Sequence, residues 1–507
     1  MTESMSMVYE VRWRIYMTGV KKNFIYNIGY QLLTVITPLI TAPYVSRVLG
    51  AYNLGVYNYT YSIADYFILF AMLGVKNYGN RQIAMVRDDK DKLSRTFSAI
   101  YGFQLMTFFS MAILYTIYIM IFVHEKMDIA FAQGMYVLTA AVDISWFFGG
   151  MEEFKLTVTR NALIKIISLI CIFTFVKQRD DLLLYTCILA GSMLTGYISV
   201  FPFLRRYIRF RKPSFREVRE HIKPNLMLFI PVIAVSIFNV MDKIMLGWMS
   251  SYVEVGLYGN TEKLMRIPLG IVTALGTVMM PHMSHMVAVG DTERSKKVIE
   301  QSMIFIMCMG CALAGGLAGV GRVFAPIFFG DEFVSCGILI IFLSPTVLSL
   351  SWANVIRMQY LIPNKMDTEF TISTIVGAVV NLVVNALLIP KYGALGAIWG
   401  TLCAETSLTV YQTWVVRKFL PIRRYLRETV PFVIIGAFMC GMVNLIGDVL
   451  NGGFGTLVIQ VLSGAIIYII CALIYILFSK QESIVQFKAI LISCVQSTIG
   501  KNLRSKQ

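Results

Sequence analysis

Apolar runs of about 20 residues, the length that an α-helix needs to cross a bilayer, recur along this whole 507-residue chain. The runs are continuous, whereas the strands of a membrane barrel are about ten residues long and alternate in polarity. The sequence therefore predicts an all-α integral membrane protein with about 14 transmembrane helices. The apolar windows cover residues 24–46, 54–75, 97–123, 129–149, 161–176, 182–204, 225–249, 255–284, 298–328, 336–359, 370–389, 393–416, 431–450 and 456–478.

The composition agrees with a fold built inside the membrane. Hydrophobic residues make up 57% of the chain and charged residues 15%, against roughly 45–50% and about 25% in a soluble domain. The connections between the windows are short, so they hold no soluble catalytic domain. A membrane-embedded enzyme would need a large loop or a His/carboxylate centre near the interface, and we identify neither. The sequence favours a transporter over an enzyme, with no cofactor and no metal site.

The net charge of +16 has an uneven distribution along the chain. Lys and Arg concentrate at both termini and in alternate connections, with the densest group at residues 205–223. By the positive-inside rule, both termini and these connections face the cytoplasm, so no nucleic-acid partner is needed to explain the charge. The basic first 22 residues lead directly into an apolar span, so we expect no cleavable signal peptide. The tail after residue 478 is predicted to form an amphipathic surface helix.

The two halves of the chain resemble each other. The window at 24–46 contains two prolines and leads into Gly-Val-Tyr-Asn at 55–58, and the window at 225–249 leads into Gly-Leu-Tyr-Gly-Asn at 256–260. Internal repeats of this kind are common in transporters that work by alternating access around a midplane cavity. We predict two pseudo-repeated six-helix lobes followed by two extra C-terminal helices and a cytoplasmic tail, which divides the chain into residues 1–210, 211–420 and 421–507.

Charged residues inside the apolar windows are the candidates for function, because a charge within a span is costly and commonly marks a transport pathway. Cationic groups suit a substrate that bears phosphate, and carboxylates suit coupling protons or sodium ions. The substrate-binding candidates are Lys263, Arg266, Arg47 and Lys243. The ion-coupling candidates are Asp65, Asp242, Glu262 and Asp143.

Spacing suggests how some of these charges are arranged. Glu262 and Arg266 are four residues apart, so they can pair along one helical face and leave Lys263 to face a cavity. Asp242 and Lys243 are adjacent and point about 100° apart, so they should have different partners. A purely structural role for such pairs is the alternative. For Arg47, near the end of its span, the alternative is anchoring at lipid headgroups.

Three stretches resemble the polysaccharide transporters and O-antigen flippases of the multidrug/oligosaccharidyl-lipid/polysaccharide exporter superfamily. They are residues 43–61, with Gly-Val-Tyr-Asn-Tyr-Thr-Tyr at 55–61; residues 143–177, with Trp-Phe-Phe-Gly-Gly at 146–150 and Glu152; and residues 263–281, with Pro-Leu-Gly at 268–270. The resemblance implies a flippase that moves an undecaprenyl-diphosphate-linked oligosaccharide across a bacterial plasma membrane, for capsule, O-antigen or exopolysaccharide synthesis. It implies membrane lipids and polysaccharide polymerase machinery as partners.

The resemblance also bears on individual residues. In the related lipid II flippases a basic residue early in the eighth helix faces the cavity, and Lys263 matches it with a Lys in place of an Arg. Arg47 is the one counterpart of the arginines in the first helix of the family. No phosphate-binding loop is present in the sequence, which favours coupling to a proton or sodium ion. The alternative is a drug or cation antiporter of the same superfamily, which needs acidic residues in the first lobe, and Asp65 keeps that alternative open.

Overall fold

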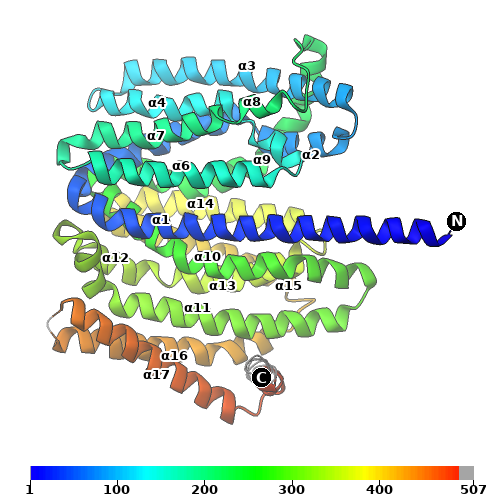
Figure 1. The fold of residues 1–507 in the computed structure, drawn as a ribbon. Helices are drawn as coiled ribbons and strands as arrows, with labels where there is room; N and C mark the ends of the chain where they lie inside the picture. The colour runs from blue at the N-terminus through cyan, green and yellow to red at the C-terminus, as the bar shows by residue number, and fades with distance from the viewer. Residues whose placement is uncertain (1, 451, 490–507) are drawn as a thin grey trace, which may run out of the picture. The chain divides into compact units, whose positions relative to one another are not determined.

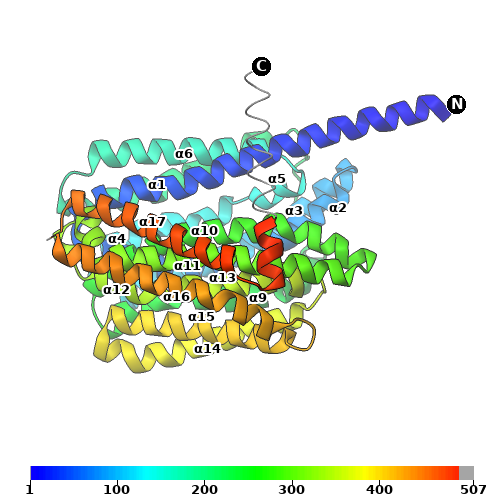
Figure 2. The same ribbon diagram turned by 90° about the horizontal axis from the view of Figure 1, so that it is seen from below.

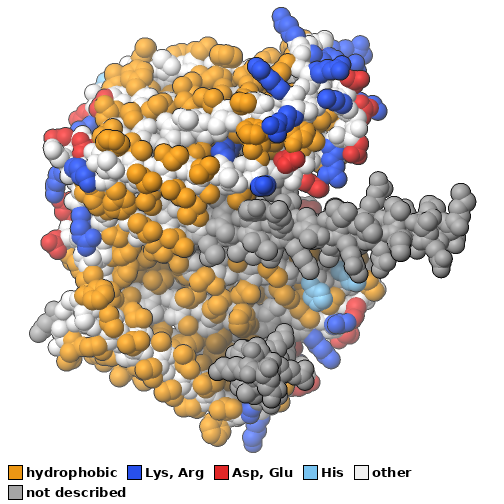
Figure 3. Space-filling view, viewed as in Figure 1, with side chains coloured by type: hydrophobic (Ala, Val, Ile, Leu, Met, Phe, Trp, Pro, Cys, Tyr) orange, Lys and Arg blue, Asp and Glu red, His pale blue; other side chains and the backbone are white. Residues whose placement is uncertain are grey.

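The computed structural model describes residues 2–450 and 452–489, and every regular element within them is helical (Figure 1). The predicted all-α membrane fold is confirmed. Ten helices in the described part are long and apolar enough to cross a membrane, and the larger count of fourteen stays a prediction. Hydrophobic side chains cover the sides of the helices, and charged side chains gather near helix ends (Figure 3).

The chain divides into two compact units, residues 1–236 and 237–507. In the first unit, α1 is a long helix that Gly50 interrupts with φ 77° and ψ 173°, a conformation that favours glycine. This kink separates the first two predicted spans. The unit contains α1 (Thr2–Met72), α2 (Val75–Val86), α3 (Lys90–Phe122), α4 (Met127–Val142), α5 (Ser145–Gly150), α6 (Phe154–Phe175), the short η1 (Arg179–Asp181), α7 (Leu182–Ile198), α8 (Phe201–Leu204) and most of α9 (Phe215–Met249).

Side-chain caps fix where some of these helices begin. Asp89 precedes α3, and its carboxylate accepts hydrogen bonds from the backbone N–H groups of Asp91 and Lys92, both at 3.1 Å. These bonds satisfy donors that have no partner within the helix. The backbone N–H of Lys92 stabilises the ionised carboxylate and lowers the pKa of Asp89. The cap thereby fixes the point at which the short segment between α2 and α3 ends and α3 begins.

The second unit contains the end of α9 and the helices that follow it. Close packing of α11 on α16 depends on glycine: a Cβ on Gly315 would lie 2.5 Å from the carbonyl oxygen of Gly436. In both views α16 and α17 run side by side (Figures 1 and 2). The elements are α10 (Tyr252–Val289), α11 (Thr292–Phe329), η2 (Asp331–Phe333), α12 (Cys336–Leu343), α13 (Thr346–Ile356), η3 (Arg357–Leu361), α14 (Asp367–Tyr392), α15 (Ala394–Val416), α16 (Ile422–Val449) and α17 (Phe454–Phe478).

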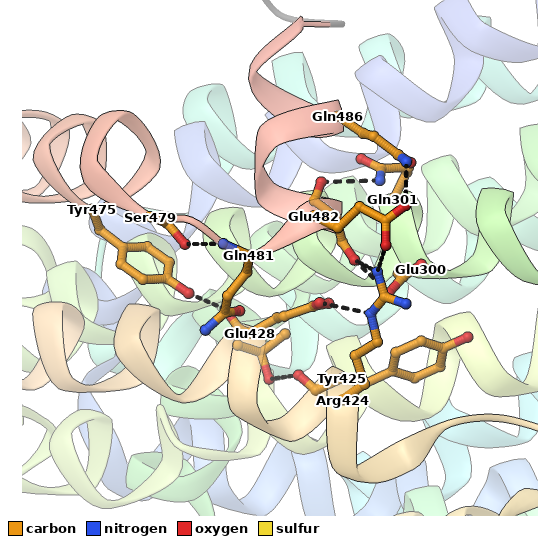
Figure 4. A network of polar contacts seen from close by, with 12 residues as sticks. Glu300, Gln301, Arg424, Tyr425, Glu428, Tyr475, Ser479, Gln481, Glu482 and Gln486 are labelled. Carbon is orange, nitrogen blue, oxygen red and sulfur yellow. Dashed lines mark hydrogen bonds and ion pairs between the residues drawn. The ribbon is translucent and has the colours of Figure 1, made fainter.

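A further helical segment at residues 482–489 follows α17. Its buried residues Ser483, Ile484 and Phe487 are interspersed with exposed ones, as an amphipathic helix requires. Arg424 of α16 connects this segment to the bundle, because its guanidinium contacts Ser483, Glu300 of α11 and Glu428 of α16 (Figure 4). The predicted amphipathic helix is thus packed on the second unit, and the remainder of the predicted tail lies outside the described residues.

Candidate functional site

A cluster of charges joins α9 and α10 in the second unit. Lys243 Nζ lies 2.6 Å from Glu262 Oε2, and Arg266 Nη2 lies 2.7 Å from Glu262 Oε1. The pairing that the four-residue spacing of Glu262 and Arg266 suggests is therefore present. The side chains of Lys243 and Glu262 are 15% and 21% exposed, whereas that of Arg266 is 66% exposed. Glu262 thus holds one sheltered and one exposed cation at the same carboxylate.

Lys263 follows Glu262 on α10 and is half-buried. Adjacent residues of a helix point about 100° apart, so the Lys263 side chain leaves the helix in a different direction from Glu262. Among the side chains that the structure describes, none forms an ion pair with Lys263. Two cations therefore pair with a single carboxylate while Lys263 lies next to it in the chain, and this surplus of positive charge suits an anionic ligand.

Asp242, which precedes Lys243 on α9, has a separate environment. It is 3% exposed, and it accepts hydrogen bonds from three other helices. Asn385 of α14 donates to Oδ1 at 2.5 Å, Thr401 of α15 donates to Oδ2 at 3.0 Å, and the hydroxyl of Tyr258 on α10 also donates to Oδ2. The adjacent residues 242 and 243 therefore have different partners, as their angular separation predicts.

The surroundings of Asp242 are rich in oxygen. Asn381 lies one turn before Asn385 on α14, and its Oδ1 accepts a hydrogen bond from Asn385 Nδ2 at 3.2 Å. Within the described residues, Asn385 Oδ1 is buried and has no hydrogen-bond partner. Polar side chains from four helices thus meet at the buried Asp242 carboxylate, which receives the amide N–H of Asn385 and the hydroxyls of Thr401 and Tyr258. Such a site can hold a proton on the carboxylate or a small cation among the oxygens.

The three candidates in the first unit are not gathered into one cluster. Arg47 is exposed near the kink in α1 and donates to the carbonyl oxygen of Pro43 at 3.3 Å. Asp65 is half-buried further along α1. Asp143 ends α4 and accepts the backbone N–H of Ser145 at 2.9 Å, which shapes the turn into α5. The roles of these residues in binding and ion coupling stay predictions.

The Trp-Phe-Phe-Gly-Gly sequence forms a packing site in the first unit. Trp146 is 1% exposed, and its indole N–H donates to Gln104 Oε1 at 2.9 Å. A Cβ on Gly79 of α2 would lie 2.5 Å from the Trp146 ring. Two acidic residues shortly after the motif have partners of their own: Glu152 pairs with Arg87 at 2.9 Å, and Glu153 accepts a hydrogen bond from the hydroxyl of Tyr207 at 2.7 Å.

Sequence reasoning missed the neutral partners of Asp242, which are Tyr258, Asn381, Asn385 and Thr401. The one signal available was the pair of asparagines four residues apart within an apolar window, a spacing that places both on one helical face. Arg357 and Glu405, by contrast, are recognisable in the sequence as charges within the apolar windows 336–359 and 393–416. The structure places Arg357 in η3, a π-helical turn of the kind often found at functional sites, and buries Glu405 in α15.

The family model described as "Polysaccharide biosynthesis protein" matches residues 20–287, and the model described as "Lipid II flippase MurJ" matches residues 154–463. Each match spans more than half of the chain. The chain belongs to the polysaccharide transporter and O-antigen flippase family. This membership agrees with the charged residues that α9 and α10 carry within their apolar windows.

Relatives of this flippase-family chain carry matching descriptions. It is 22% identical over 405 residues to the "Putative O-antigen transporter" of Escherichia coli (strain K12), which covers 79% of the chain and 97% of the relative. It is 22% identical over 269 residues to the "Probable low-salt glycan biosynthesis flippase Agl15" of Haloferax volcanii, which covers 52% of the chain and 56% of the relative.

Solved structures share the fold of this flippase-family chain. An inward closed lipid II flippase MurJ matches with a TM-score of 0.66 at 12% identity, over 89% of this chain and 98% of that one. An inward-facing multidrug resistance transporter of the MATE family matches with a TM-score of 0.59 at 13% identity, over 80% of this chain and 99% of that one. At these identities the likeness concerns the fold alone.

Proposed function

We propose that this protein is a flippase that moves an undecaprenyl-diphosphate-linked oligosaccharide across a bacterial plasma membrane for surface polysaccharide synthesis. The observation that carries the proposal is the excess of positive charge at Glu262, whose single carboxylate pairs with Lys243 and Arg266 while Lys263 follows it in the chain. The names of the relatives, an O-antigen transporter and a glycan biosynthesis flippase, support it. Both termini then face the cytoplasm, and polysaccharide polymerase machinery takes up the product.

The ion pairs of Glu262 suggest which cations are held in place and which one is available to the substrate. Glu262 already engages Lys243 and Arg266, so it fixes the position of those two cations. Lys263 has no such partner among the described side chains and is the cation most available to a diphosphate. A lysine binds phosphate as a compact charge rather than as a bidentate fork. We therefore assign Lys263 to the headgroup, with Arg266 as a second, exposed contact.

We further propose that Asp242 couples transport to a proton or a sodium ion. To bind a small cation, the Asn385 amide would turn its buried, unpartnered Oδ1 toward Asp242 in place of the Nδ2 that donates there, and Asp242, Asn381 and Thr401 would supply the other oxygens. Because Asp242 and Lys243 are adjacent on α9, movement of this helix on ion binding would reach the substrate cluster directly. This adjacency gives a short physical route between the two sites.

Deletion of the gene in its host tests the proposal. We expect loss of surface polysaccharide together with lipid-diphosphate-linked oligosaccharide that accumulates on the cytoplasmic leaflet. Complementation with the intact gene should clear the trapped intermediate. Normal polysaccharide with altered drug sensitivity would contradict the flippase and favour the antiporter alternative that Asp65 keeps open.

A further inference from the structure

A groove on the second unit lies where α15 turns into α16. Its volume is about 890 Å³, within the range of roughly 300–1,000 Å³ that is usual for ligand pockets. Trp352 of α13, Val410 and Trp414 of α15 and Leu426 of α16 supply apolar lining. Val410 and Trp414 are 61% and 54% exposed, so this apolar surface is open. The groove is lined by α13, α15 and α16, whereas the charges at residues 243–266 lie on α9 and α10.

Three basic residues line the same groove: Arg417, Lys418 and Arg423. All three are exposed, and no acidic side chain of the described residues forms an ion pair with any of them. The neighbouring Arg424 behaves differently, because it contacts Glu300 at 2.6 Å and Glu428 at 3.1 Å (Figure 4). The chain thus neutralises one cation of this turn with its own carboxylates, and among the described residues it supplies no carboxylate to the three in the groove.

The helix dipoles explain only part of this arrangement. Arg417 and Lys418 follow the C-terminus of α15, where positive charge is favourable. Arg423 lies in the first turn of α16, where positive charge is unfavourable and an anion would be stabilised. An external anion seated between the two helix ends would compensate Arg423.

The apolar side chains that line the groove restrict the chemical class of that anion. Trp352 donates its indole N–H to Thr413 Oγ1 at 2.8 Å, which fixes the ring in the groove. The Arg417 guanidinium lies 4.9 Å from the centre of the Trp414 ring, so the cationic rim adjoins the apolar wall. Tryptophan beside basic residues is typical of the membrane–water interface. A soluble phosphate compound would leave the open apolar wall uncovered, whereas a lipid with an anionic headgroup covers both parts.

We propose that this groove is a binding site for an anionic glycerophospholipid, with its phosphate at Arg417, Lys418 and Arg423 and an acyl chain along Trp352, Trp414 and Leu426. Basic pockets between transmembrane helices bind anionic headgroups elsewhere. The lipid would hold the start of α16 against α13 and α15. The assignment does not depend on the flippase function.

The test uses the full-length protein, purified in detergent and stripped of lipid, with phosphatidylglycerol as the probe and native mass spectrometry as the readout. The triple variant Arg417→Gln, Lys418→Gln, Arg423→Gln should bind phosphatidylglycerol about 100-fold more weakly, since each basic residue contributes roughly fivefold. The matched control is Arg294→Gln, Lys296→Gln, Lys297→Gln, which removes the same charge from the start of α11 and should bind normally.

A second pair of variants tests the apolar wall without changing charge. Val410→Trp fills the groove and should weaken phosphatidylglycerol binding, whereas Val379→Trp, at a site on α14 that is 53% exposed, should not. Equal binding by both triple variants, or phosphatidylcholine binding as tightly as phosphatidylglycerol, would overturn the proposal. Undecaprenyl diphosphate is added as a competitor in the same experiment only to overturn the assignment. If it displaces phosphatidylglycerol from the intact protein and itself binds the Arg417, Lys418, Arg423 triple variant weakly, the site belongs to the transport substrate.

Discussion

The ammonium group of Lys243 and the carboxylate of Glu262, on α9 and α10 respectively, form an ion pair of 2.6 Å with side chains 15% and 21% exposed. Because both groups are sheltered from water, this pair is held more firmly than one on a soluble surface. Glu262 also binds Arg266. One carboxylate therefore sets the positions of two cations of the candidate substrate site.

Replacement of Glu262 by Gln should remove the carboxylate that Lys243 and Arg266 share. We expect transport to fall by about tenfold, because Lys243 and Arg266 lose their orientation and about 1.4 kcal/mol of transition-state binding with it. The fall in transport is measured as the initial rate of headgroup translocation in proteoliposomes. Glu293→Gln, which removes an exposed partner of Lys296, is the control. Unchanged transport in Glu262→Gln would show that the cluster is only structural.

Replacement of Lys263 by Ala should abolish transport while membrane insertion stays intact, since this cation lacks an internal partner among the described side chains. Lys263→Arg should retain most of the activity because the charge is preserved. Complementation of the deletion strain and the amount of protein in the membrane fraction are the two measurements. Full complementation by Lys263→Ala would remove Lys263 from the site.

Replacement of Asp242 by Asn should separate transport from the ion gradient. The neutral side chain keeps the shape of the site but cannot exchange a proton or balance a sodium ion. Transport in proteoliposomes should then be slow and insensitive to imposed proton or sodium gradients. The comparison variant is Asp143→Asn, which removes the charge from the turn between α4 and α5 in the first unit. If Asp143→Asn removes gradient dependence and Asp242→Asn keeps it, coupling belongs to the first unit.

The sequence was sufficient for those parts of the fold that depend on one segment at a time. Apolar length located the spans, and the kink at Gly50 falls between the first two of them. The spacing of Glu262 and Arg266 was sufficient to suggest their pairing, because both lie on one helix. Asn385 was not identified, because it contacts Asp242 across 143 residues of sequence and a neutral amide in a span carries no charge signal.

The family motif shows a different limit. Trp-Phe-Phe-Gly-Gly is part of the resemblance to the flippase family, yet in the structure its tryptophan packs against Gly79 and donates a hydrogen bond to Gln104. A characteristic motif can reflect packing as readily as chemistry, and only the partners of the side chain distinguish the two.

Gly79→Ala tests that packing role. The added methyl group would lie 2.5 Å from the Trp146 ring, which is buried and cannot move aside. Overpacking of this kind costs about 1–3 kcal/mol, so the thermal stability of the purified protein should fall. Gly191→Ala is the matched control, because a Cβ there meets no atom within 4 Å. Equal stability of the two variants would argue against a tight contact between α2 and the motif.

Arg424→Gln addresses how the segment at residues 482–489 is held. Glu428 is 0% exposed and Glu300 is 7% exposed, and both contact the Arg424 guanidinium (Figure 4). Loss of the cation leaves these carboxylates unpaired, and removal of one partner of a buried ion pair costs roughly 3–5 kcal/mol. Because the Arg424 side chain is 37% exposed, we expect a loss of about 2 kcal/mol, with faster proteolysis after α17.

The control and the rescue separate charge pairing from simple side-chain loss. Arg427→Gln removes an exposed cation from the same helical turn and should leave stability and proteolysis unchanged. In the double variant Arg424→Gln, Glu428→Gln one of the two buried negative charges disappears with its partner while Glu300 remains, so part of the lost stability should return. A double-mutant cycle measured by thermal unfolding gives the coupling directly. Additive effects of the two substitutions would mean that the carboxylate of Glu428 does not depend on Arg424.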